Sequence, residues 1–162
     1  MGKNEKEIIL NNIFNRKSVR TYTDDEINKE DLLLILKAGM SAPSTCNFQP
    51  WQFIVIQNNE TVKDMGNIHK YAKMFKNAKA GIIVVGDMEK TLKNSKDYWI
   101  EDCSAATENM LLCIEALGLG AVWTGIYPVE ERVNKLKEYF NLPENIVPFA
   151  LIALGYPKGP QK

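Results

Sequence analysis

Apolar positions along the chain follow two different spacings, which predict alternating helices and strands. Spacings of three and four residues indicate amphipathic helices over about 5–14, 29–40, 97–117 and 128–142, with one or two short helices within 60–77. Uninterrupted runs rich in β-branched and aromatic residues predict buried strands at 51–57, 80–87, 121–127 and 147–157. We therefore expect an α+β fold with helices flanking a small central sheet of about four strands.

Polar and glycine residues at the predicted helix ends support this assignment. Asn28 precedes a helix with acidic residues in its first turn, as an N-cap does, and Pro128 suits the start of a later helix. The GLG at 118–120 indicates a helix stop, because it lacks the strand-to-helix order of a dinucleotide-binding fingerprint. A small sheet cannot cover every apolar helix face, so we expect a leftover face on the long helix to meet a second copy of the chain.

Composition narrows the function classes. The 162 residues suit a single domain over 1–162. Lys and Arg number 20 and Asp and Glu number 20, so no net field attracts nucleic acid or an anionic membrane. Three cysteines without a CxxC pair and a single histidine, His69, predict no metal site and no Ser-His-Asp triad. With no signal peptide and no apolar run of about 18 residues, we expect a cytoplasmic protein.

A basic run, RKSVR at 16–20, follows the first predicted helix. In an extended segment, alternation places Arg16, Ser18 and Arg20 on one side. Two guanidinium groups and a hydroxyl suit a phosphate, which Arg binds through paired charge-assisted hydrogen bonds. A solvated basic loop is the alternative.

Two further segments carry candidate binding groups. The loop APSTCNFQPW at 42–51 holds hydroxyl and amide side chains between prolines, which suits a flat heterocycle, although an ordinary connection has the same composition. Cys46 in this loop has no evident basic neighbour in the sequence and is interpreted as a plain loop cysteine. Gly125 interrupts an apolar strand, which indicates either a close approach of backbone to a ligand or a bulge.

Four blocks in this order, RKSVRTY, APSTCNFQPW, YWIEDCSAATENMLLCIEALGLGAVWTGIYP and ALIALGYP, resemble short members of the nitroreductase family of FMN-dependent oxidoreductases. The resemblance covers about residues 10–157. It implies a nitroreductase-like fold, an intertwined homodimer and FMN at the subunit interface. It also implies roles for the basic run, the loop and the strand end: phosphate and ring-edge contacts from Arg16, Lys17, Ser18 and Arg20, ring contacts across the interface from Pro43, Ser44, Thr45, Asn47 and Gln49, and backbone N–H groups near the ring from Thr124 and Gly125.

The activity that the resemblance implies needs no catalytic side chain, because the flavin carries the chemistry. It is the transfer of reducing equivalents from NADH or NADPH to a nitroaromatic, quinone or related small-molecule acceptor by a ping-pong mechanism. A flavin-binding carrier or sensor dimer with little turnover is the alternative. A nucleic-acid binder that uses 16–20 is disfavoured by the zero net charge.

Overall fold

The computed structural model describes residues 3–94 and 97–159. These residues form five α-helices and four strands, with short 3₁₀ turns between them. The helices are α1 (Lys3–Asn15), α2 (Lys29–Met40), α3 (Asn59–Asp64), α4 (Tyr98–Ala116) and α5 (Glu130–Phe140). The strands are β1 (Trp51–Ile56), β2 (Ala80–Asp87), β3 (Gly120–Gly125) and β4 (Ile146–Gly155). The 3₁₀ turns are η1 (Thr45–Asn47), η2 (Met65–Asn67), η3 (Lys73–Lys76) and η4 (Met88–Lys90). The predicted α+β architecture is confirmed.

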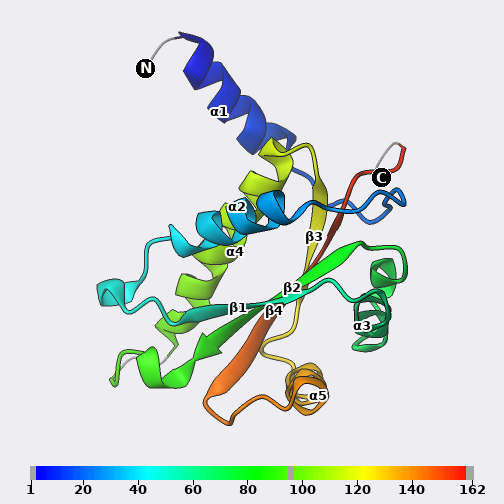
Figure 1. Cartoon of the computed structure of the whole chain (residues 1–162). Helices are drawn as coiled ribbons and strands as arrows, with labels where there is room; N and C mark the ends of the chain where they lie inside the picture. Colours follow the sequence, from blue (N-terminus) through cyan, green and yellow to red (C-terminus); the bar gives the residue numbers. More distant parts are fainter. Residues whose placement is uncertain (1–2, 95–96, 160–162) are drawn as a thin grey trace.

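The four strands form one sheet in the order β1-β2-β4-β3, and every neighbouring pair is antiparallel. Helices α2 and α4 lie on one face, and α3 and α5 lie on the other (Figure 1). Cover on both faces explains why β2 and β4 have nearly continuous apolar sequences instead of alternating ones.

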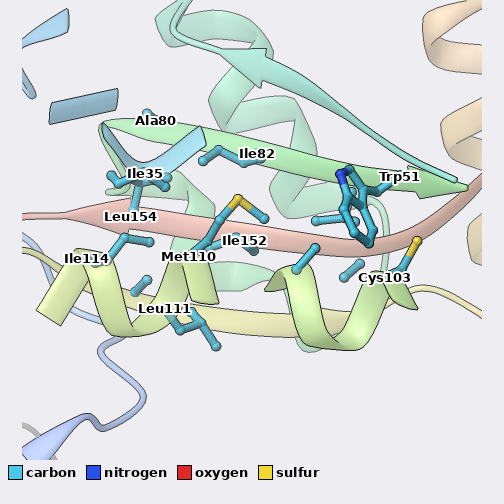
Figure 2. Packing of buried hydrophobic residues seen from close by; sticks show 14 of the residues in the cluster. Ile35, Trp51, Ala80, Ile82, Cys103, Met110, Leu111, Ile114, Ile152 and Leu154 are labelled. Carbon is cyan, nitrogen blue, oxygen red and sulfur yellow. The ribbon is translucent and has the colours of Figure 1, made fainter. Parts of the chain in front are cut away.

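The larger cluster of buried side chains lies between the sheet and the pair α2 and α4. Ile82 of β2 and Ile152 of β4 point toward Ile35 and Met110, which come from the two helices (Figure 2). All four side chains are fully buried. Since each such side chain contributes about 1.5–3 kcal/mol on burial, this layer fixes α4 against the sheet.

The second cluster lies on the opposite face of the same strands. Ile83 and Leu151 pack there with Met65, Phe75 and Leu136, which come from η2, η3 and α5. Successive residues of β2 therefore contribute to different clusters, as the two-residue period of a strand requires. This layer holds the 60–77 region close to the sheet, although only its first part is α-helical.

The predicted helix ends are correct to within about two residues, as expected for such boundaries. Asn28 caps α2, because its side chain accepts a hydrogen bond from the backbone N–H of Asp31 at 2.7 Å. Gly118 follows α4 with φ of +72°, which confirms the predicted helix stop. The last predicted helix begins at Glu130, two residues after Pro128, because Val129 is still extended.

Two facing glycines allow residues 18–22 to lie directly against the edge of the sheet. Gly120 of β3 and Gly155 of β4 are register partners. A Cβ on Gly120 would lie 2.6 Å from the Val19 side chain, and one on Gly155 would lie 3.0 Å from Tyr22. The Val19 N–H donates to Ala121 O at 2.8 Å in the space that the glycines leave. The GLG run therefore does more than end the helix: its second glycine permits this contact.

Helix α1 extends away from the rest of the molecule (Figure 1). Apolar side chains remain exposed along it, namely Ile8, Ile9, Ile13 and Phe14. The uncovered apolar face predicted on α4 lies instead on α1, and α2 also exposes Leu33, Leu34 and Met40. No helix in the described part of the chain has the length and apolar character that a membrane span needs.

Replacement of Gly120 by alanine should destabilise the fold, whereas the same change at Gly125 should not. The new methyl group at 120 would overlap Val19, and overpacking of this kind costs about 1–3 kcal/mol. A Cβ on Gly125 meets no atom within 4 Å. Urea unfolding of the ligand-free variants measures the two free energies of unfolding. Equal losses at the two positions would contradict the close approach of Val19 to β3.

Candidate functional site

A hollow of about 670 Å³ opens beside the end of β3, and we call it the β3 hollow. Its walls include Arg20, the β3 residues Thr124 and Gly125, and Arg132 of α5. The remaining wall comes from Val122 and Trp123 of β3 and from the segment 69–77. The volume lies within the range of about 300–1,000 Å³ that is usual for small-molecule sites.

The basic run at 16–20 reaches this hollow with one of its two arginines. Backbone pairing of Ser18 and Val19 with Ala121 holds the run beside the beginning of β3, and Arg20 is among the residues that line the hollow. Arg16 instead lies near α4, where its Nε is 3.4 Å from the Glu108 carboxylate. Within the chain, Arg20 therefore lines the hollow and Arg16 does not.

The end of β3 presents backbone rather than side chains to the hollow. The Thr124 side chain is buried and donates a hydrogen bond to Leu151 O at 2.7 Å. The register between β3 and β4 runs unbroken to Gly125, which excludes a bulge there. Open space where a Cβ would stand at Gly125 supports the other interpretation, a close approach of backbone to a ligand. Arg132 fixes this end, since its guanidinium donates to Gly125 O at 2.8 Å.

The loop before β1 has a defined conformation, as its composition predicts. Three of its residues, Cys46, Asn47 and Gln49, have positive φ angles of 48°, 58° and 48°. The Ser44 hydroxyl oxygen accepts a hydrogen bond from the Gln49 N–H at 3.0 Å. However, no residue from Pro43 to Gln49 is among those lining the β3 hollow.

Asp102 of α4 is a positioning residue that the sequence analysis missed. Its carboxylate is buried and accepts hydrogen bonds from the Thr45 N–H at 2.8 Å and the Thr45 hydroxyl at 3.2 Å. A buried carboxylate needs such partners, because burial without hydrogen bonds is costly. The signal in the sequence is an acidic residue next to Cys103, on the side of the helix that faces inward.

The segment 69–77 was assigned no binding role from sequence, yet it forms one wall of the β3 hollow. Lys70, Lys73 and Lys76 recur every three residues, and η3 has about three residues per turn, so this spacing favours one side of the segment. The His69 ring is half-buried, and its Nδ1 accepts a hydrogen bond from the Tyr71 N–H at 3.2 Å. Burial, together with the positive charges of Arg132 and Lys135, lowers the pKa of His69, so the imidazole stays neutral near pH 7.

These groups provide cationic side chains and uncovered backbone in the walls of one hollow. Guanidinium groups bind anionic oxygens, and backbone at a glycine permits close contact with a flat ring. The arrangement therefore suits an elongated ligand that has an anionic group and a planar ring.

Known proteins match the chain over nearly its whole length. The Nitroreductase family model matches residues 13–98 and 68–156. A protein of Archaeoglobus fulgidus, provisionally named an NADH dehydrogenase/NAD(P)H nitroreductase, is 49% identical over 152 residues, or 94% of this chain and 87% of that protein.

Solved structures share the fold. An FMN-dependent nitroreductase from Clostridium difficile superposes with a TM-score of 0.87 at 29% identity, covering 94% of this chain and 90% of the other. A protein of Desulfovibrio desulfuricans, provisionally described as a nitroreductase and solved in complex with FMN, gives a TM-score of 0.79 at 34% identity, covering 95% and 91% of the two chains. Sequence and fold therefore agree that this chain belongs to the nitroreductase family.

Proposed function

We propose that the chain is an FMN-dependent oxidoreductase that takes reducing equivalents from NADH or NADPH and passes them to a nitroaromatic, quinone or related acceptor. The observation that carries the proposal is the β3 hollow, which has Arg20 and the uncovered backbone at Gly125 in its walls. Family membership and the FMN-binding relative support the choice of cofactor.

The residues present fit FMN. Any side chain at 125 would project into open space next to the hollow, so the glycine leaves room for a ring there. Arg20 provides a permanent positive charge for a phosphate. Thr124 and Gly125 would direct backbone groups toward the ring edge, where hydrogen-bond donors stabilise the negative charge of a reduced flavin.

FMN, when bound, supplies the hydride and electron transfer chemistry. The chain's own contribution is orientation. The unbroken pairing of β3 with β4 and the hydrogen bond from Arg132 hold Gly125 in place. The Thr124 hydroxyl donates to Leu151 O, so it serves the fold and takes no part in proton transfer. A ping-pong order follows if donor and acceptor use the same open face in turn.

The complete site requires two chains. Thr45 is held by Asp102 of α4 and does not line the β3 hollow of its own chain, whereas Arg20 does. The loop 43–49 has a defined conformation but does not line the hollow of its own chain. It is therefore available to complete the hollow of a partner chain. The exposed apolar side chains of α1 are a suitable contact surface for that homodimer, because such a patch is unfavourable in water.

A spectrum distinguishes this enzyme from a flavin carrier or sensor. Purified protein supplied with FMN should show bound-flavin absorption, and acid should release FMN unchanged. Under anaerobic conditions NADH or NADPH should bleach that absorption within seconds, and an added quinone or nitroaromatic should restore it. Binding without bleaching would support the carrier, and tighter binding of FAD than of FMN would contradict the proposed cofactor.

The Arg20 contact can be tested with two forms of the ligand. Arg20→Ala should weaken FMN binding by about 1.5–3 kcal/mol, the usual contribution of a hydrogen bond to a charged group. Riboflavin lacks the phosphate and should bind the variant and the parent nearly equally. Fluorescence titration of the apoprotein measures both affinities. A loss of the same size for riboflavin would remove Arg20 from the phosphate site.

Mixed dimers test the shared site. One variant carries Arg16→Ala and Arg20→Ala, and the other carries Ser44→Trp and Thr45→Trp, so each homodimer should be nearly inactive. Refolding the two together in equal amounts should give about half mixed dimers, each with one intact site. Activity should return to about one quarter of the parent value at equal protein. If both segments served the same chain's site, mixing would restore nothing.

A further inference from the structure

A second hollow of about 580 Å³ adjoins the β3 hollow, and we call it the basic hollow. The two hollows share four wall residues, namely His69, Lys70, Lys73 and Arg132. Lys76 and Lys135 line the basic hollow but not the β3 hollow. A ligand that occupies the β3 hollow can therefore extend over these shared residues into the second hollow.

Positive charge is concentrated around this second hollow, although the whole chain is neutral. Five cationic side chains line it, namely Lys70, Lys73, Lys76, Arg132 and Lys135. Glu131 is the one carboxylate among its described wall residues, and it is bound by Lys135 at 2.7 Å. Lys70, Lys73, Lys76 and Arg132 form no ion pair with any described residue. Cations gathered around a concave surface focus a field that attracts an anion.

The neutral wall residue His69 adds a hydrogen-bond donor rather than a charge. Its Nδ1 accepts from the Tyr71 N–H, so the hydrogen of the neutral ring is on Nε2. That Nε2 is buried and has no partner within the described structure. His69 lines both hollows, so an anion there is the acceptor available to this group.

Arg132 connects the two hollows. One of its guanidinium nitrogens donates to Gly125 O at 2.8 Å, at the proposed ring site. The guanidinium has five N–H donors in all, so others remain for a second acceptor. Arg132 is half-buried and lines both the β3 hollow and the basic hollow. Through Arg132, a ligand in the basic hollow would therefore contact a side chain that also holds Gly125 at the end of β3.

We propose that the basic hollow binds a phosphate of the reduced dinucleotide while its nicotinamide lies in the β3 hollow. This inference rests on the proposed function, because the dinucleotide is the hydride donor there. Lysine ammonium groups bind phosphate as point charges, and a cluster of them suits a doubly charged group. Two phosphates could occupy the site: the pyrophosphate that NADH and NADPH share, or the 2′-phosphate that only NADPH carries.

Calorimetric titration with adenosine, 5′-ADP and 2′,5′-ADP tests the subsite on the protein supplied with FMN. The parent should bind at least one of the two phosphorylated ligands tenfold or more tightly than adenosine. The variant Lys76→Glu/Lys135→Glu should lose that advantage, because both residues lie outside the β3 hollow and only the basic hollow changes charge. Loss for both ligands, or for 5′-ADP alone, assigns the pyrophosphate position, because both ligands carry a 5′-phosphate and only 5′-ADP carries a 5′-diphosphate. Loss for 2′,5′-ADP alone assigns the 2′-phosphate.

The control variant Lys63→Glu/Lys90→Glu makes the same change in net charge away from both hollows, and its affinities should stay within twofold of the parent. Thermal melting confirms that each variant is folded. Unchanged affinity in the Lys76→Glu/Lys135→Glu protein, an equal loss in the control, or no preference of the parent for phosphate would each overturn the proposal. The titration does not require turnover. The anaerobic bleaching experiment therefore reports separately on the proposed activity.

Discussion

Burial of β2 and β4 on both faces is the constraint on which the rest of the structure depends. Strands this apolar need a layer of cover on each side, and a chain of this length has few elements to provide it. α2 and α4 supply one layer, while α3, the 60–77 region and α5 supply the other. α1 has no place in either layer. Its isoleucines and phenylalanine therefore stay exposed, and the proposed homodimer would cover them.

The same arrangement determines where the site forms. β3 is an edge strand, so its free side is open to residues 18–22, and the facing glycines 120 and 155 let those residues come close. Arg20 follows this contact and lines the same hollow as Gly125, which leaves open space. α5 follows β3 after a short connection, and Arg132 near its start reaches back to Gly125 O. Local chain geometry thus gathers the charge and the uncovered backbone in one place.

The distribution of charge adds a second level of organisation. A neutral chain has no general attraction for anions, yet cations from the 69–77 segment and from α5 meet around one hollow. These two segments are far apart in sequence and both cover the same face of the sheet. A flavin phosphate at Arg20 and a dinucleotide phosphate at Lys76 and Lys135 would then be bound by different basic groups.

The sequence by itself determined the helices and the strands, because apolar spacing and local capping act within a few residues. It also carried the resemblance to the family, which depends on the order of four local blocks. It indicated Arg20 and Gly125 for the same reason: a permanent cation and a missing side chain are properties of single positions. Only the tertiary structure showed that Arg16 pairs with Glu108 and that Asp102 holds Thr45. It also brought Lys76 and Lys135 to one hollow. These contacts join residues from separate elements, and their partners are set by the packing of the two layers, which no local pattern encodes.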